Sequence, residues 1–241
     1  MHRICGRRRE EVWRKFPLAR LVWRRLLPDG NRIYCKWSDY RIIRDVYFDS
    51  NYEKHFKPEL GMVVVDAGAH VGFFTLKMAK QVGTHGRVIA VEPENENFGF
   101  LVTNVTLNGY ENVVPAKVAL SNFEGVATFF LKSHSSSHSL IGKTWRTPII
   151  DSVTVKVTTL DSLLRKVGVE IVDLLKVNIE GAELNALLGA RNFLDHKRIK
   201  KIVVMVHPPY DETASKICAY LRGRKYRTLI GNKSKVIYGF A

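Results

Sequence analysis

The sequence predicts an α/β fold built around a mostly parallel sheet of seven strands that closes with a C-terminal antiparallel hairpin. Short runs rich in β-branched residues recur without polar alternation, which is typical of parallel strands buried on both faces. Segments with apolar residues at helical spacing separate these runs, and a glycine turn joins the first run to its helix. The buried runs cover residues 62–65, 87–91, 172–177 and 201–206.

The first βαβ unit spans residues 61–92 and has the sequence GMVVVDAGAHVGFFTLKMAKQVGTHGRVIAVE. Its first strand ends at Asp66, a turn containing Gly68 and Gly72 follows, and apolar residues then recur at helical spacing from Phe73. Glycine lacks a Cβ, so the backbone can approach a ligand closely, and the helix start directs unpaired N–H groups toward it. The turn is therefore predicted to hold a carboxylate or a phosphate.

The second strand of this unit ends at Glu92, an acid placed where both hydroxyls of a ribose can donate to it. A dinucleotide site has the pattern G-x-G-x-x-G, and Asp66 would repel its pyrophosphate. The pattern here is D-x-G-x-x-x-G, with Ala69 and His70 in the turn. It resembles the signature of class I S-adenosylmethionine (SAM) methyltransferases, in which the acid suits the amino group of the methionine moiety. The alternative is a doubly wound sheet whose glycines serve packing alone.

Length and composition predict one α/β domain at residues 32–241, preceded by a basic arm or lid at residues 1–31. Hydrophobic residues make up 46% of the chain and charged residues 25%, as in an ordinary globular protein. No apolar run reaches the roughly 20 residues of a membrane span, and the N-terminus lacks the apolar core of a secretory signal, so a cytoplasmic protein is expected. Three widely spaced cysteines are expected to be reduced and structural, namely Cys5, Cys35 and Cys218.

Positive charge is concentrated near the N-terminus of this basic protein. The formal net charge is +15 and the sequence pI is about 9.8. Residues 3–25 interleave basic residues with apolar ones at loosely helical spacing, and Pro17 interrupts the pattern, which predicts two short helices. Such a segment binds nucleic acid phosphates or an acidic membrane surface, or it packs its tryptophans on the main domain as a lid. The sequence leaves these alternatives open.

The remaining elements are predicted from the same periodicities and from turn residues. Two antiparallel hairpins are expected, one laid on the edge of the sheet and one at the C-terminus. The helices are expected near residues 39–48, 93–109, 160–167, 184–188 and 211–223. Further strands are expected at residues 32–37 and 113–119. The first hairpin is expected to pair residues 125–131 with 152–158, and the second to pair residues 226–230 with 235–240.

A polar loop containing the run SHSSSHS separates the strands of the first hairpin and is predicted to be a mobile substrate loop. His134 and His138 are four residues apart, but no third ligand lies nearby in the sequence, so no metal site is predicted. Leu120 and Ser121 leave the sheet at the position where such folds flank an adenine ring.

Polar residues end two of the buried strands. Asn178 and Glu180 follow the strand at 172–177, and His207 follows the strand at 201–206. Ligands bind in the crevice at the carboxyl ends of such strands, so Asn178 and Glu180 are predicted to face the cofactor and the acceptor. His207 titrates near neutrality and is the first candidate general base, with Glu180 the second. A hydrogen-bonded structural histidine is the alternative role for His207.

Several segments, taken together and in order, resemble the FkbM family of SAM-dependent methyltransferases. They are VVVDAGAHVGFFTL, VIAVEPENENFGFL, VKVTTLDSLL and DLLKVNIEGAELNALLGA, followed by a strand that ends in VHP. The resemblance runs from about Arg32 to the C-terminus. It implies a Rossmann-like class I methyltransferase fold, SAM as the methyl donor, and O-methylation of a small molecule or sugar. Family members usually carry Asp where this chain has Asn178, and the family does not account for the basic arm.

Three functions are compatible with these features. The leading one is O-methylation of a hydroxyl on a small molecule or glycan, in which the enzyme holds the acceptor oxygen and the methyl carbon in line at about 3 Å. The second is methylation of RNA, whose phosphates the segment at 3–25 would bind. The third is a non-catalytic SAM-fold binding module, suggested by Asn178. The acceptor and the oligomeric state are not predicted.

Overall fold

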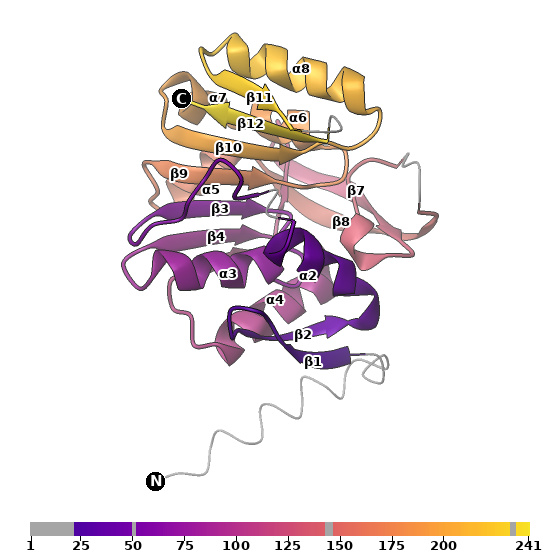
Figure 1. Cartoon of the computed structure of the whole chain (residues 1–241). Coiled ribbons are helices and arrows are strands. Elements are labelled where there is room, and N and C mark those ends of the chain that lie inside the picture. The colour runs from indigo at the N-terminus through magenta and orange to yellow at the C-terminus, as the bar shows by residue number, and fades with distance from the viewer. Residues whose placement is uncertain (1–21, 50–51, 143–146, 232–234) are drawn as a thin grey trace.

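A seven-stranded sheet forms the centre of the computed structural model, which describes residues 22–49, 52–142, 147–231 and 235–241 (Figure 1). The strand order is β11-β12-β10-β9-β3-β4-β5. Neighbours from β10 to β5 run parallel, whereas β12 is antiparallel to both β10 and β11, so the predicted fold class is confirmed. The strands are β3 (Val63–Ala67), β4 (Arg87–Val91), β5 (Val113–Ala116), β9 (Val172–Val177), β10 (Ile199–Met205), β11 (Arg227–Ile230) and β12 (Val236–Phe240).

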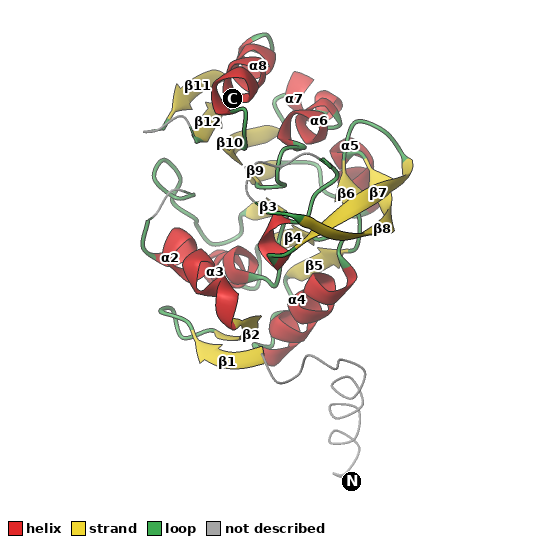
Figure 2. Cartoon of the chain, turned by 90° about the vertical axis from the view of Figure 1, so that its right-hand side faces the viewer, coloured by secondary structure: helices red, strands yellow, loops and turns green. Residues whose placement is uncertain are grey.

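Helices cover both faces of this sheet, which explains why its central strands are apolar without alternation (Figure 2). One face packs Val64 and Val88 against α2 (Tyr40–Tyr47), α3 (Phe73–Val82) and α4 (Asn95–Leu107). The other face packs Val65 and Ile89 against α5 (Leu160–Lys166), α6 (Glu183–Leu188), α7 (Arg191–Asp195) and α8 (Tyr210–Arg222). The helices predicted between residues 39 and 223 are all present, with bounds within two residues of those expected.

The hairpin that was expected on the edge of the main sheet belongs to a separate sheet. Its strands β7 (Gly125–Lys132) and β8 (Ile149–Thr158) pair antiparallel as predicted. The strand expected at 113–119 is split, because the chain leaves the main sheet after β5, and β6 (Ala119–Leu120) then pairs with β8. Pro115 in β5 has no N–H to donate, which suits an edge strand.

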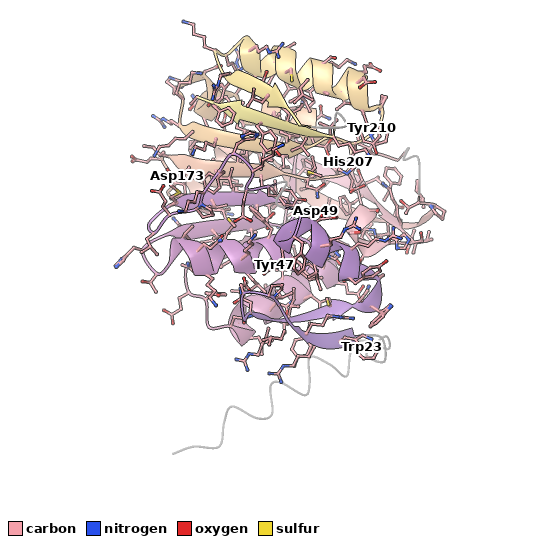
Figure 3. All side chains as sticks on the ribbon, in the orientation of Figure 1. Trp23, Tyr47, Asp49, Asp173, His207 and Tyr210 are labelled. Carbon is pink, nitrogen blue, oxygen red and sulfur yellow. The ribbon has the colours of Figure 1, made fainter. Side chains whose placement is uncertain are left out.

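The helices expected at residues 3–25 lie largely outside the described residues, and at residues 22–25 the chain is instead a strand. β1 (Val22–Leu26) pairs antiparallel with β2 (Arg32–Lys36), so the predicted domain boundary at residue 32 falls within this hairpin. Ile33 and Cys35 of β2 are fully buried and anchor the hairpin against α4, with Trp23 at its rim (Figure 3).

Cys35 and Cys218 are both buried free thiols, as expected of structural cysteines. Burial raises the pKa of Cys35 to about 11, so this thiol stays protonated and unreactive at neutral pH. Within the described residues, no helix is long and apolar enough to cross a membrane.

Leu164 on α5 tests the packing of this helix against the sheet. Its side chain is fully buried, so Leu164→Ala leaves a cavity and should lower the free energy of unfolding by about 2–5 kcal/mol in urea titrations. Leu188→Ala on α6, an exposed leucine in a comparable helix, is the matched control and should cost clearly less. Equal losses at both positions would contradict the packing described here.

Candidate active site

The turn after β3 brings the carboxyl ends of three strands together. The N–H groups of Gly68 and Ala69 donate to Val91 of β4, at 3.0 and 2.9 Å, and the N–H of Asn178 donates to Ala67, at 3.1 Å. A Cβ on Gly68 would lie 2.0 Å from the carbonyl oxygen of Asn178, and φ at Gly68 is +81°, so only glycine fits there. Gly72, also at positive φ, begins α3.

Asp66 lies beneath this turn and is paired with Lys176 near the carboxyl end of β9. The Nζ of Lys176 donates to Asp66 Oδ1 at 2.7 Å and to the carbonyl oxygen of Gly68 at 2.8 Å. The Thr75 hydroxyl donates to the other carboxylate oxygen of Asp66 at 2.6 Å. Asp66 therefore does not line the cavity described next, and its carboxylate is already engaged. Sequence reasoning missed Lys176, although a lysine inside an apolar strand is itself a signal of a buried partner.

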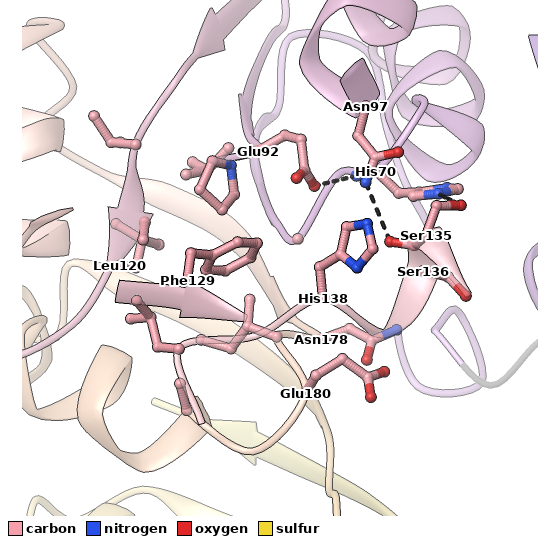
Figure 4. Close-up of a pocket in the computed structure, with 18 residues that line it drawn as sticks. His70, Glu92, Asn97, Leu120, Phe129, Ser135, Ser136, His138, Asn178 and Glu180 are labelled. Carbon is pink, nitrogen blue, oxygen red and sulfur yellow. Dashed lines mark hydrogen bonds between the residues drawn. The ribbon is translucent and has the colours of Figure 1, made fainter. Parts of the chain in front are cut away.

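A cavity of about 540 Å³, including its open mouth, lies between this turn, β4, β9 and the second sheet (Figure 4). Six predicted site residues line it, whereas Asp66, Ala69, Gly72 and Ser121 do not. The lining residues are Gly68, His70, Val91, Glu92, Pro93, Asn97, Val118, Ala119, Leu120, Phe129, Ser135, Ser136, His138, Leu140, Asn178, Ile179, Glu180 and Ala182.

Glu92 is held at the end of β4 by two backbone donors. Its carboxylate accepts the N–H of His70 at 2.9 Å and the N–H of Glu94 at 3.0 Å. Burial raises the pKa of Glu92 to about 7. Each carboxylate oxygen keeps a further lone pair, so the ionised group can accept from two neighbouring hydroxyls of a ligand.

The polar loop after β7 was expected to be mobile, but its described part forms a wall of the cavity. The Nε2 of His70 lies 3.0 Å from the hydroxyl of Ser135, and Asn97 donates to the backbone carbonyl of Ser135 at 3.2 Å. His138 accepts the N–H of Lys132 at 2.9 Å. Burial lowers the pKa of His70 to about 3 and that of His138 to about 4, so both rings are neutral. These loop contacts are tertiary and have no signature in the sequence.

A second, wider cavity adjoins the first, and Glu180 lines both. His207 lines the second cavity only. The two predicted catalytic residues are thus brought together, on the side away from the glycine turn. The wall of the second cavity consists of Ser137, Ile141, Gly142, Thr147, Pro148, Ile149, Glu180, Gly181, His207, Pro208, Pro209, Tyr210 and Thr213.

His207 is clamped between two carboxylates. Its Nε2 lies 2.9 Å from Glu180 and its Nδ1 lies 2.8 Å from Glu183, a fully buried residue that the sequence analysis did not single out. Burial lowers the pKa of His207, but the hydrogen bonds to Glu180 and Glu183 outweigh it and raise the pKa to about 10. His207 is therefore an imidazolium at neutral pH. An imidazolium has no lone pair with which to accept a proton.

No group of three or more His, Cys, Asp or Glu side chains could hold a metal ion in the part of the chain that the structure describes. His134 and His138 thus form no such group with a further ligand among these residues.

The first cavity fits a nucleoside that carries hydroxyl and amino groups. Three residues of its wall have buried polar atoms that lack a hydrogen-bond partner among the described residues, namely His70 Nδ1, Asn97 Oδ1 and Asn178 Oδ1. Such orphaned groups are rare and call for a ligand or water. Glu92 offers acceptors for ribose hydroxyls, while Leu120 and Phe129 provide the apolar flank that an aromatic base requires.

A Rossmann-like sheet with a nucleoside cavity at the first glycine turn defines a class I methyltransferase fold. The model of the methyltransferase FkbM domain matches residues 66–228 of this chain. The chain therefore belongs to the FkbM methyltransferase family, and SAM is its methyl donor.

Two curated relatives are similar in sequence. Methyltransferase sdnD of Sordaria araneosa is 26% identical over 176 residues, which cover 61% of this chain and 67% of sdnD. AMB antimetabolite synthetase AmbE of Pseudomonas aeruginosa is 24% identical over 226 residues, which cover 77% of this chain. The match covers 10% of AmbE, so this chain corresponds to a small part of that protein.

Solved structures with a similar fold include two SAM-dependent proteins. Aeropyrum pernix fibrillarin in complex with natively bound S-adenosyl-L-methionine matches 91% of this chain and 94% of its own, at 15% identity and a TM-score of 0.49. A SAM-dependent methyltransferase from Aquifex aeolicus matches 82% of this chain and 90% of its own, at 17% identity and a TM-score of 0.46. At this identity, neither structure indicates an acceptor for this chain.

The pKa of Glu92 predicts that SAM affinity depends on pH. Ionised Glu92 would accept from both ribose hydroxyls and the protonated acid would not, so affinity should increase as the pH rises through about 7. Glu92→Gln should weaken SAM binding about 10- to 100-fold and abolish this pH dependence in calorimetric titrations. Glu96→Gln, one turn away and outside the cavity wall, is the control. Wild-type affinity in Glu92→Gln would remove the ribose assignment.

The clamp on His207 predicts its protonation state. Both ring nitrogens should carry protons at neutral pH in ¹⁵N NMR spectra, with titration only near pH 10. The raised pKa also contributes stability that is fully present below the ordinary value of 6.5 and is lost as the pH rises through about 10. A ring that titrates at its ordinary pKa would show that the clamp is absent in solution and would restore His207 as a candidate base.

Proposed function

We propose that the protein transfers the methyl group of SAM to a hydroxyl of a small molecule or glycan bound in the second cavity. What supports this proposal most is the position of Glu180, the predicted site residue whose side chain lines both cavities. An acceptor in the second cavity would meet the donor beside this carboxylate.

SAM supplies an activated methyl group on its sulfonium, so the residues of the chain need only bind, orient and move one proton. Glu92 holds the ribose, and Gly68 and Asn178 border the methionine end. Asp66 acts through Lys176 by holding the turn rather than by touching the donor, because Asp66 is fully buried and lies outside the cavity wall. This role differs from the direct contact that the sequence suggested.

Glu180 is the acceptor of the hydroxyl proton in this proposal, and His207 positions it. Both ring nitrogens of His207 contact carboxylates. The Nε2 lies 2.9 Å from a carboxylate oxygen of Glu180 and the Nδ1 lies 2.8 Å from one of Glu183, so the ring fixes the position of Glu180. Glu180 also has a positive φ of 57°, an uncommon conformation that the Ser139 hydroxyl supports by donating to its carbonyl oxygen. A carboxylate paired with an imidazolium is a weak base, which suffices when the leaving group is as good as a thioether.

The wall of the second cavity suits a neutral, hydroxylated acceptor. It combines apolar surfaces, such as Ile141 and Tyr210, with hydroxyl groups, such as Ser137 and Thr213. Within the described residues, neither cavity is lined by a lysine or an arginine, which phosphate recognition would use. The name of AmbE, an antimetabolite synthetase, accords with a small-molecule acceptor.

RNA methylation is the second candidate, favoured by the net charge of +15 and by the basic residues before β1. A non-catalytic SAM-binding module is the third.

Incubation with radiolabelled SAM and either total RNA or an extract of metabolites and glycans separates the three candidate functions. Label in the extract supports the proposal, label in RNA selects the second candidate, and binding without transfer selects the third.

The role of Glu180 predicts a selective loss of turnover. With an acceptor identified from the extract, Glu180→Gln should lower kcat about 100-fold or more while SAM affinity is retained. Glu170→Gln, at an exposed position, is the matched control and should leave kcat unchanged. Full turnover in Glu180→Gln would contradict the proton transfer assigned to this residue.

A further inference from the structure

One face of the segment formed by η2 (Trp37–Asp39) and α2 carries large aromatic side chains into solvent. Trp37, Tyr40 and Phe48 are 59%, 53% and 66% exposed. They recur at helical spacing together with the exposed Arg41 and Arg44, so all five side chains lie on one face. This set is called the aromatic stripe below. Exposed aromatic groups of this size on a continuous face indicate an interaction surface.

The opposite face of the same segment is firmly packed. Val46 is buried, and Ile42 and Ile43 pack against the core cluster that contains α3. Lys77 of α3 donates to the carbonyl oxygen of Val46 at 3.0 Å. The inner face of the segment therefore holds it against the core.

The β1–β2 hairpin extends the aromatic stripe. The ring of Trp23, which is 52% exposed, lies 5.5 Å from that of Trp37, and the guanidinium of Arg25 lies 4.7 Å from the centre of the Trp37 ring. Figure 3 shows Trp23 at the edge of the molecule. The chain immediately before β1 adds further positive charge in its sequence, including Lys15 and Arg20.

The charges around the aromatic stripe are mostly positive. Arg25 and Arg41 have no acidic partner among the ion pairs of the described residues. Arg44 lies 4.0 Å from Asp45 and 3.6 Å from Asp49, but its side chain is 70% exposed, so these contacts are weak. Basic residues interleaved with exposed Trp, Tyr and Phe are the composition of segments that lie at the interface of an anionic bilayer.

The ring geometry favours lipid over single-stranded nucleic acid. Successive bases stack on open ring faces. Here Trp23 and Trp37 are tilted by 55°, and Arg25 lies over the Trp37 ring. Phe48 has no polar group to contact a nucleotide, whereas it adds apolar area to a surface that inserts among acyl chains.

The structure points to a membrane-docking surface: we propose that the aromatic stripe, with Trp23 and Arg25, binds the headgroup region of anionic bilayers. An ion pair connects this surface to the cofactor cavity. Lys36, the residue before η2, pairs with Glu96 at 2.7 Å. Asn97, which follows Glu96 in the sequence, lines the cavity. Docking would hold the enzyme at a surface where amphiphilic acceptors concentrate. The proposal does not depend on which acceptor is methylated.

Co-sedimentation of the full chain with vesicles tests this surface. Binding to vesicles of phosphatidylcholine and phosphatidylserine is expected, with little binding to phosphatidylcholine alone, and added salt should weaken it. Trp37→Ser/Phe48→Ser should lower the partition coefficient about tenfold or more, and Arg41→Gln about fivefold. Tyr40→Ser/Phe48→Ser, which leaves the contacts of Trp37 in place, provides a second pair if the first disturbs folding, as judged by SAM affinity.

Matched controls lie on the second sheet. Val126→Ser/Ile150→Ser removes two residues that are 64% and 67% exposed, and Lys156→Gln removes one exposed charge, so both should leave vesicle binding unchanged. Several results would overturn the proposal. They are absence of binding to anionic vesicles, equal losses in the controls, tighter binding to single-stranded RNA that depends on the aromatic stripe, or self-association of the protein through it in sedimentation velocity.

Discussion

The buried ion pair between Lys176 and Asp66 is the contact on which the site depends. Burying two charges is costly, and the cost is offset here because each charge is fully hydrogen-bonded. The ammonium donates to Asp66 and to the carbonyl oxygens of Gly68 and Ala67, and Thr75 donates to Asp66. The pair joins the two adjacent central strands β3 and β9 to the glycine turn. It therefore determines where the wall of the cofactor cavity lies.

Burial and partners set the charge of each titratable group around the two cavities. The imidazole ring of His70 is buried, has no carboxylate as a hydrogen-bond partner and is neutral. The ring of His207 is clamped by two carboxylates and is an imidazolium. Glu92 is buried with two backbone donors, and its pKa of about 7 lies between these extremes. The charged groups that line the first cavity, around a cationic cofactor, are thus the carboxylates of Glu92 and Glu180. The proton-transfer machinery is confined to the border with the second cavity.

Much of the fold follows from local sequence pattern. The β-branched runs, the glycine turn and the helical spacings specify β3, α3, β4 and β9. A strand in the middle of a parallel sheet is buried on both faces, and a helix packed on the sheet buries one apolar stripe, so each leaves its own pattern in the sequence. The positions of Glu92, Asn178 and Glu180 follow as well, since residues at strand ends meet at one edge of the sheet. What could not be predicted depends on contacts distant in sequence.

Lys176 and Glu183 illustrate this limit. The sequence does not identify the partner of either residue. Asp66 lies 110 residues from Lys176, and His207 lies 24 residues from Glu183. The loop after β7 is predicted from its composition to be a mobile substrate loop, and its contacts with His70, Asn97 and Glu180 have no local signature in the sequence. The short strand β1 is predicted to be helical because the apolar residues of the segment at 3–25 fall loosely at helical spacing, whereas in the structure it pairs with β2 as a strand.

A crystal structure of the full chain with SAM bound would test the central claim most directly. The nucleoside should occupy the cavity between the glycine turn and Phe129, both ribose hydroxyls should donate to Glu92, and Asp66 should remain paired with Lys176. A nucleoside bound elsewhere, or a methionine amino group that displaces Lys176 from Asp66, would contradict it.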